Sequence, residues 1–137
     1  MTKTSVLFVC THNSARSQMA EGLLNYLYGD RFEAFSAGTE QTRVHPLAIE
    51  AMRRVGIDIS GHESKIVDRF GEKQFDIVIT VCDLARATCP FVPALKKRLH
   101  WSLEDPSSAT GTRDQQLAVF EKVREAIRQK VIEHFGQ

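Results

Sequence analysis

The sequence predicts an α/β fold in which a parallel sheet is flanked by helices on both faces. Short runs of consecutive apolar residues, such as Ser5–Val9 and Phe75–Val81, are typical of strands that are buried on both faces. Segments with apolar residues at helical spacing separate these runs, and strands that alternate with helices form parallel sheets. With 137 residues, the chain has the size of one domain, so we expect a single domain over residues 1–137.

The individual elements are predicted in the following order. The strands cover Ser5–Val9, Phe32–Ser36, Phe75–Val81 and Arg98–Trp101. The first helix ends at Gly29, and its apolar face consists of Ala20, Leu23, Leu24, Leu27 and Tyr28. The second begins at Pro46 and ends at Gly56, with an apolar face of Leu47, Ala48, Ala51, Met52 and Val55. A capping box of Thr112 and Gln115 starts the last helix, whose apolar stripe is Leu117, Phe120, Val123, Ile127, Val131 and Phe135.

Composition excludes several classes of protein. The 18 basic and 17 acidic residues give a net charge of +1, which argues against a nucleic-acid or membrane partner. The longest apolar runs are too short to span a membrane, and the N-terminus lacks the features of a secretory signal. We therefore expect a cytoplasmic protein, and a monomer by default. Three cysteines without a CxxC pair favour neither a disulfide framework nor a metal site.

The loop between the first strand and the first helix has the layout of an oxyanion site. Cys10 ends the strand, and Arg16 stands where the helix begins. Such a loop can point its backbone N–H groups at an anion, the helix adds its positive end, and Arg16 can bind two oxygens. This field favours the thiolate of Cys10 as a nucleophile, and Ser17 can donate a hydrogen bond to its sulfur. The expected oxyanion-binding residues are Thr11, His12, Asn13, Ser14, Ala15 and Arg16. The alternative is a buried thiol beside a surface arginine.

Six segments of the chain resemble a known family. They read VLFVCTHNSARSQMAEG, SAGT, HPLAIEAM, GIDISGHESK, FDIVITVC and HWSLEDP. In this order they are similar to thioredoxin-coupled arsenate reductases, which share the low-molecular-weight protein tyrosine phosphatase fold. The resemblance implies a four-stranded parallel sheet, Cys10 as the nucleophile, Arg16 as the oxyanion clamp and Asp105 as the general acid. Without the resemblance, Asp105-Pro106 would be interpreted as an ordinary turn.

The other two cysteines distinguish a reductase from a phosphatase, because the reduction of arsenate needs two electrons. The resemblance implies that Cys10 attacks arsenate, that Cys82 then attacks Cys10 and releases arsenite, and that Cys89 attacks Cys82. Thioredoxin would reduce the resulting Cys82–Cys89 disulfide, no bound cofactor would be needed, and phosphate or sulfate would compete with arsenate. If residues 82–89 are helical, the two Cα atoms lie about 10.5 Å apart, and a disulfide requires less than about 7 Å. We therefore expect the segment to unwind when it is oxidised.

Two functions remain as alternatives, and one ion site is expected to be altered. The alternatives are a phosphotyrosine phosphatase, whose activity could also persist weakly beside arsenate reduction, and a thiol redox sensor without catalysis. Against the phosphatase, Ser107–Ala109 lacks an aromatic residue to grip a tyrosine ring. Some members of the family bind potassium through residues that match Asn13, Glu21 and Ser36, together with an acidic residue where this chain has Lys65. We expect no metal here and the Lys65 ammonium in the ion's place.

Overall fold

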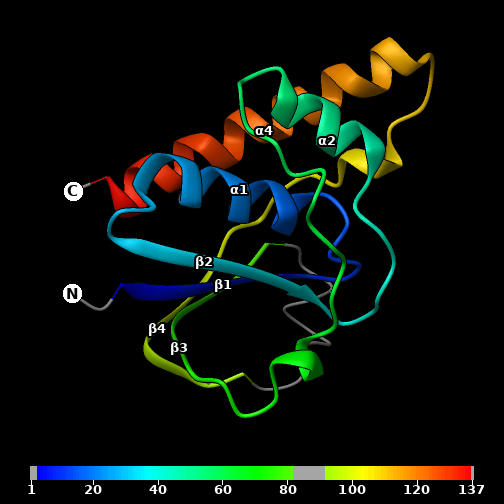
Figure 1. Cartoon of the computed structure of the whole chain (residues 1–137). Helices are drawn as coiled ribbons and strands as arrows, with labels where there is room; N and C mark the ends of the chain where they lie inside the picture. Colours follow the sequence, from blue (N-terminus) through cyan, green and yellow to red (C-terminus); the bar gives the residue numbers. More distant parts are fainter. Residues whose placement is uncertain (1–2, 82–91, 137) are drawn as a thin grey trace.

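The computed structural model describes residues 3–81 and 92–136, and it contains a four-stranded parallel sheet (Figure 1). The strands are β1 (Thr4–Cys10), β2 (Phe32–Gly38), β3 (Phe75–Thr80) and β4 (Ala94–His100), in the spatial order β2-β1-β3-β4. All three neighbouring pairs run parallel. The last five residues of β1 are buried, as expected for a strand covered on both faces. The predicted parallel sheet is confirmed.

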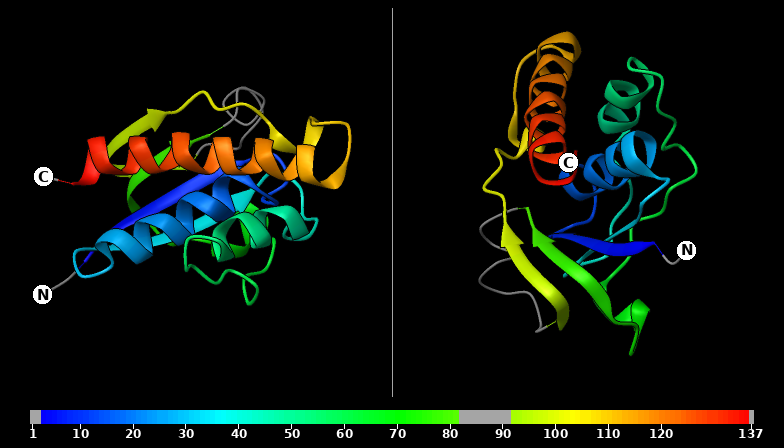
Figure 2. Two further views of the ribbon diagram at one scale, coloured as in Figure 1. Left: turned by 90° about the horizontal axis from the view of Figure 1, so that it is seen from above. Right: turned by 90° about the vertical axis from the view of Figure 1, so that its left-hand side faces the viewer.

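Helical segments lie on both sides of this sheet (Figure 2). The α-helices α1 (Arg16–Tyr28), α2 (Pro46–Arg53) and α4 (Arg113–Phe135) lie on one side, and the 3₁₀ helix η1 (Val67–Phe70) lies on the other. Successive residues of β2 show the two faces, because side chains alternate along a strand. Ser36 donates to Glu21 of α1 at 2.7 Å, whereas Phe35 packs edge-on against Phe70 of η1, with 5.9 Å between ring centroids. The predicted covering of both faces is confirmed.

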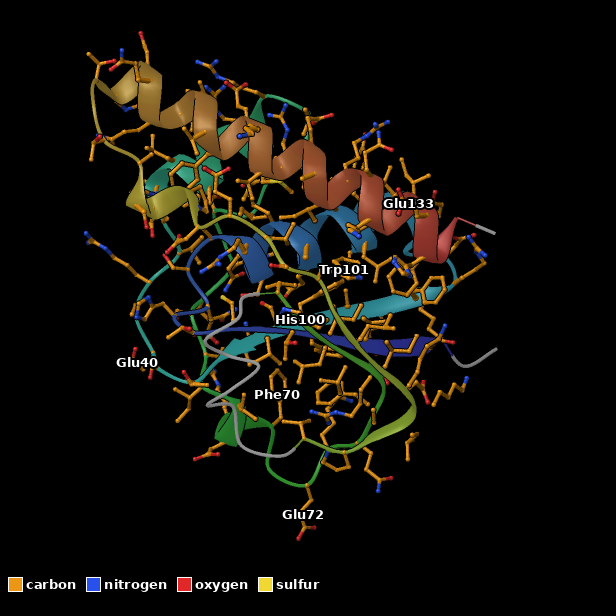
Figure 3. The ribbon with its side chains drawn as sticks, turned by 180° about the vertical axis from the view of Figure 1, so that it is seen from behind. Glu40, Phe70, Glu72, His100, Trp101 and Glu133 are labelled. Carbon is orange, nitrogen blue, oxygen red and sulfur yellow. The ribbon has the colours of Figure 1, made fainter. Side chains whose placement is uncertain are left out.

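The longest helix, α4, closes the core above the sheet. Its capping box is formed, with Gln115 N–H donating to the Thr112 hydroxyl and Thr112 N–H donating to the Gln115 side chain. All six residues of its predicted apolar stripe are buried. Beneath α4, Trp101 follows β4 and packs against Phe8 of β1, on the opposite side of the sheet from Phe70 (Figure 3). This packing holds the carboxyl end of β1 in a rigid core.

The largest differences from the predicted element boundaries occur at two places. The second helix ends at Arg53 rather than at Gly56, and Val55 is 38% exposed instead of belonging to the apolar face. The strand predicted at Arg98–Trp101 begins four residues earlier, at Ala94. The first half of this strand was not predicted, because β4 is an edge strand whose exposed lysines break the apolar pattern of a buried strand. Within the described ranges, no helix is both long enough and apolar enough to cross a membrane.

Candidate active site

The candidate site lies at the carboxyl end of β1, in the middle of the sheet. In open parallel sheets, ligands bind beyond the carboxyl ends of the strands, where the connections leave in opposite directions. The connection from β1 leads to β2, its neighbour on one side, and β3 lies on its other side. A small cavity of about 20 Å³ opens at this point, and its lining residues are Cys10, His12, Ser14, Ala15, Arg16, Asp105 and Ser107. Five of these seven belong to the predicted loop and two to the predicted acid turn.

The sulfur of Cys10 is buried and receives a hydrogen bond from a neighbouring hydroxyl. Cys10 is 3% exposed, and its Sγ lies 2.9 Å from the Oγ of Ser17, which is fully buried. The Nδ2 of Asn13 donates to the same Oγ at 2.8 Å. A thiolate can only accept, so when Cys10 is ionised the Ser17 hydroxyl donates to Sγ while its oxygen accepts from Asn13. A donor aimed at Sγ stabilises a thiolate, as the sequence predicted for Ser17.

The backbone of the loop is tightly curled around this sulfur. Asn13 has a φ of +50°, a left-handed conformation that asparagine tolerates better than most residues. The loop packs directly on β2, so that a Cβ added at Gly38 would lie 2.6 Å from the carbonyl oxygen of Thr11 and 2.8 Å from Asn13 N. Only glycine allows so close an approach. Gly38 is therefore part of what shapes the loop.

Arg16, the first residue of α1, forms one wall of the cavity. It donates from one Nη to the carbonyl oxygen of Leu103 at 3.1 Å, and its other Nη lies 3.6 Å from Oδ2 of Asp105. Among the described residues, no side chain caps the start of α1 and no acidic residue lies in its first turn. An anion placed in the cavity would thus meet the positive end of the helix and the guanidinium.

Asp105 has the position of a general acid but is held in its charged form. Burial would raise the pKa of this carboxyl, but two hydrogen bonds from Ser107 and the charges of Arg16 and His12 outweigh it and lower the pKa. The hydroxyl and the backbone N–H of Ser107 both donate to Oδ1, at 2.7 and 3.0 Å. Asp105 therefore starts the 3₁₀ helix η2 (Pro106–Ser108) as its cap. The predicted residue reaches the site, in the turn that its sequence also predicted.

Two histidines lie around the mouth of the cavity. His12 is half exposed and lines the cavity, and its Nε2 lies 2.9 Å from a carboxylate oxygen of Glu40. His45 caps α2 by accepting from Leu47 N–H at 3.1 Å and stacks on Phe120 of α4. Burial, followed by the charge of Arg43, lowers the pKa of His45, although Asp105 opposes the shift.

The residues of the expected ion site are occupied by hydrogen-bond donors. Oδ1 of Asn13 accepts from Lys65 N–H at 2.8 Å, and Oε1 of Glu21 accepts from the hydroxyl of Ser36. The Lys65 ammonium donates to the carbonyl oxygen of Glu63 at 2.9 Å. In the part of the chain that the structure describes, no group of three His, Cys, Asp or Glu side chains comes together.

Cys82 and Cys89 lie outside the described residues. The structure describes the chain as far as Val81, whose backbone N–H donates to the carbonyl oxygen of Val9 at 2.9 Å. Val9 immediately precedes Cys10 in β1. The described segment that ends at Val81 therefore lies beside the strand that ends at Cys10.

Comparison with known proteins identifies the family. The sequence pattern described as "Low molecular weight phosphotyrosine protein phosphatase" matches residues 5–137. The chain belongs to this family. An arsenate reductase of Halalkalibacterium halodurans is 42% identical over 131 residues, which cover 96% of this chain and 94% of the relative. An arsenate reductase of Bacillus subtilis is also 42% identical, and the match covers 93% of this chain and 92% of the relative.

Solved structures of this family have the same fold. An arsenate reductase in a phosphate-binding state matches with a TM-score of 0.77 at 37% identity and covers 95% of both chains. A thioredoxin-dependent arsenate reductase of Corynebacterium glutamicum matches with a TM-score of 0.71 at 29% identity, over 99% of this chain and 61% of that one. The predicted low-molecular-weight phosphatase-like fold is confirmed.

One residue that supports the site was not identified from the sequence. Gln18 is fully buried in α1, and its Nε2 lies within hydrogen-bond distance of both oxygens of Asn13 and of the carbonyl oxygen of Glu63, at 2.9 to 3.2 Å. Glutamine is a common helix former, so its type gives no signal. The signal comes from its position, because Gln18 lies between Ser17 and Met19 in a buried turn of α1. A long polar side chain in such a turn needs buried partners.

Proposed function

We propose that this protein reduces arsenate to arsenite, with electrons that thioredoxin supplies. The observation that carries the proposal is the buried Cys10 sulfur, which accepts from Ser17 at the base of a cavity walled by Arg16. Relatives named arsenate reductases, at 42% identity, support arsenate as the oxyanion. An arsenate reductase of the same fold in a phosphate-binding state supports a tetrahedral oxyanion as the ligand.

In the first step, the Cys10 thiolate attacks arsenic. A sulfur–arsenic bond forms as one arsenic–oxygen bond breaks, and the departing hydroxide takes a proton from Asp105 to leave as water. Asp105 must first become protonated, whereas its pKa is lowered before an anion binds. An arsenate dianion would take over Arg16 as its own partner and place negative charge beside Asp105. Both changes favour the protonated carboxyl.

In the later steps, two electrons pass from sulfur to arsenic. The Cys82 thiolate attacks Cys10, a disulfide forms, and the electron pair of the broken sulfur–arsenic bond stays on arsenic as arsenite. Cys89 then attacks Cys82 and frees Cys10, and thioredoxin reduces the Cys82–Cys89 disulfide. The position of Val81 supports this order, because its backbone N–H donates to Val9 in the strand that ends at Cys10. The thioredoxin-dependent relative supports the electron donor.

The hydrolysis of phosphate monoesters is the second candidate, because it is the activity for which the family is named. It needs Cys10, Arg16 and Asp105 but neither of the other cysteines. Among the described residues, no Phe, Tyr or Trp lines the cavity, which favours a small anion over an aryl phosphate. A cytoplasmic location, where thiols remain reduced, suits the relay, and we propose a monomer as the working unit.

One experiment distinguishes these functions. Arsenite release is followed with thioredoxin, thioredoxin reductase and NADPH for the native chain, Cys10→Ser and Cys82→Ser. We expect multiple turnovers only for the native chain. Trypsin places the three cysteines on separate peptides, residues 4–16, 74–86 and 87–96, so mass spectrometry can identify each disulfide after one turnover. Phosphate-ester hydrolysis that persists in Cys82→Ser, with no arsenite from the native chain, would instead indicate a phosphatase.

We also propose that turnover does not depend on potassium. Lys65 and Gln18 both donate to the carbonyl oxygen of Glu63, and the oxygens of Asn13, Glu21 and Ser36 are already engaged in hydrogen bonds. The steady-state rate should be equal in potassium chloride and sodium chloride at the same ionic strength. A severalfold stimulation by potassium alone would contradict the replacement of the ion by Lys65.

A further inference from the structure

A chain of four side-chain hydrogen bonds runs from the surface of the protein to the sulfur of Cys10. Nδ1 of His62 lies 3.1 Å from Oε1 of Gln18, and Nε2 of Gln18 lies 2.9 Å from Oδ1 of Asn13. Nδ2 of Asn13 lies 2.8 Å from Oγ of Ser17, which lies 2.9 Å from the sulfur. Gln18, Asn13 and Ser17 are fully buried, so bulk water does not compete for these bonds.

Backbone groups determine the orientation of the two amides in this chain. Lys65 N–H can only donate, so the Asn13 atom that it meets at 2.8 Å is the oxygen, and Nδ2 must face Ser17. The carbonyl oxygens of Asn13 and Glu63 can only accept, so the Gln18 atom near both is its nitrogen. Oε1 of Gln18 then accepts from His62. When Cys10 is a thiolate it can only accept, so all four protons point towards the sulfur, an arrangement in which each bond strengthens the next.

From this arrangement, we propose that Gln18 is a positioning residue that fixes the amide of Asn13 and thereby keeps the Ser17 proton on the Cys10 thiolate. The proposal rests on the nucleophilic role of Cys10 in the proposed function. Gln18 never touches the sulfur or the cavity. It acts because Nε2 binds Oδ1 of Asn13, which leaves Nδ2 as the only group that can face Ser17. Gln18 also joins the loop to the segment around Glu63, since the same Nε2 reaches that carbonyl oxygen.

Two substitutions at position 18 separate this role from simple packing. Gln18→Glu keeps the shape but replaces the donor by an acceptor, which would face three acceptor oxygens. The Asn13 amide can relieve this by turning over, at the expense of its hydrogen bond from Lys65 N–H, so that its oxygen takes the Ser17 proton away from the sulfur. Gln18→Met removes the donor without reversing it, and Lys65 N–H still orients Asn13. The effect of Gln18→Glu should therefore exceed that of Gln18→Met.

The readout is the pH dependence of Cys10 alkylation by iodoacetamide, because only the thiolate reacts. Mass spectrometry of the peptide of residues 4–16 isolates Cys10 from the other two cysteines, and no arsenate is required. We expect Gln18→Glu to move the midpoint of the profile up by about one pH unit, a tenfold loss of alkylation rate at pH values below it. Gln18→Met should lower the same rate about twofold. Asn25→Asp is the matched control, since Asn25 is another amide of α1 but binds the backbone of Ala34 in β2.

Measuring the effect of Gln18→Glu in a Ser17→Ala variant tests whether Gln18 acts through the Ser17 hydroxyl. If Gln18 works through the Ser17 proton, Gln18→Glu should move the midpoint in the native chain but not in Ser17→Ala. A shift that persists in full without the hydroxyl would mean that the new charge acts through space, and it would overturn the proposal. An unchanged profile in Gln18→Glu would overturn it as well. If that variant does not fold, an unchanged profile in Gln18→Met has the same meaning. Failure of arsenate reduction alone would leave these profiles intact and would refute only the proposed function.

Discussion

At the scale of single residues, the site combines a cation that suits a tetrahedral anion, Arg16, with a carboxylate that occupies this cation in the structure. Asp105 is a carboxylate near Arg16; burial alone would raise its pKa, but Ser107 and Arg16 both lower it. Cys10 is buried with a donor on its sulfur. Each of these groups gains a better partner when an oxyanion enters: Arg16 gains two oxygens, and Asp105 gains a proton.

The first prediction concerns Asp105. Asp105→Asn should lower kcat for arsenate by about a hundredfold or more, because an amide cannot protonate the departing oxygen. KM should not rise, since the uncharged amide would no longer compete with the anion for Arg16. Steady-state rates of arsenite release test both parameters. Glu104→Gln is the control: Glu104 is half exposed and pairs with Lys122, away from the cavity. Equal losses in the two variants would argue against a general acid at position 105.

At the scale of the elements, each part of the site is held by the end of a helix or strand. Cys10 ends β1, Arg16 begins α1, and Asp105 caps η2. Gly38 and His45 help to hold these ends in place through their contacts with neighbouring elements. Gly38 lets the loop backbone lie against β2, and His45 caps α2 while it packs on α4.

Gly38→Ala should damage the loop more than the fold. The added Cβ would lie 2.6 Å from the carbonyl oxygen of Thr11, and this backbone can only move away by opening the loop. We expect a loss of about 1–3 kcal/mol in the free energy of unfolding, together with weaker binding of phosphate. Urea denaturation and isothermal titration calorimetry measure the two effects. Gly61→Ala is the matched control, because nothing lies within 4 Å of its added Cβ. Unchanged phosphate affinity in Gly38→Ala would contradict the role of this contact.

His45 makes the stability of the protein depend on pH. Burial lowers its pKa from 6.5, so below about pH 6.5 the unfolded chain binds a proton that the folded chain resists. The contribution of His45 to stability is complete above pH 6.5 and is lost as the pH falls towards the lowered pKa. His45→Asn keeps a capping oxygen but does not titrate. Between pH 7.5 and pH 5.5, the free energy of unfolding should therefore decrease less in His45→Asn than in the native chain; an equal decrease would argue against this role.

At the scale of the whole molecule, the sequence predicted what is local and missed what depends on distant partners. Consecutive apolar residues were enough to identify β1 and β3, and the capping box was enough to start α4. The edge strand β4 was predicted too short because its charged residues face solvent. Gln18 was missed because its importance comes from Glu63, 45 positions away. The meeting of Arg16 and Asp105 followed only from the family resemblance, since no local pattern joins residues so far apart.

The closed state of the cavity leads to the last prediction. Arg16 meets Asp105 across a space of about 20 Å³, so an incoming anion must displace the carboxylate from the guanidinium. Phosphate, which binds only the folded chain, should raise the thermal midpoint, and at a hundredfold excess over Kd the gain is about 2.7 kcal/mol. The gain should be larger in Asp105→Asn, where the competitor has no charge, and absent in Arg16→Met. Differential scanning calorimetry in phosphate, with chloride at equal ionic strength as the control, measures all three. A smaller gain in Asp105→Asn would mean that Asp105 helps to hold the anion instead of competing with it for Arg16.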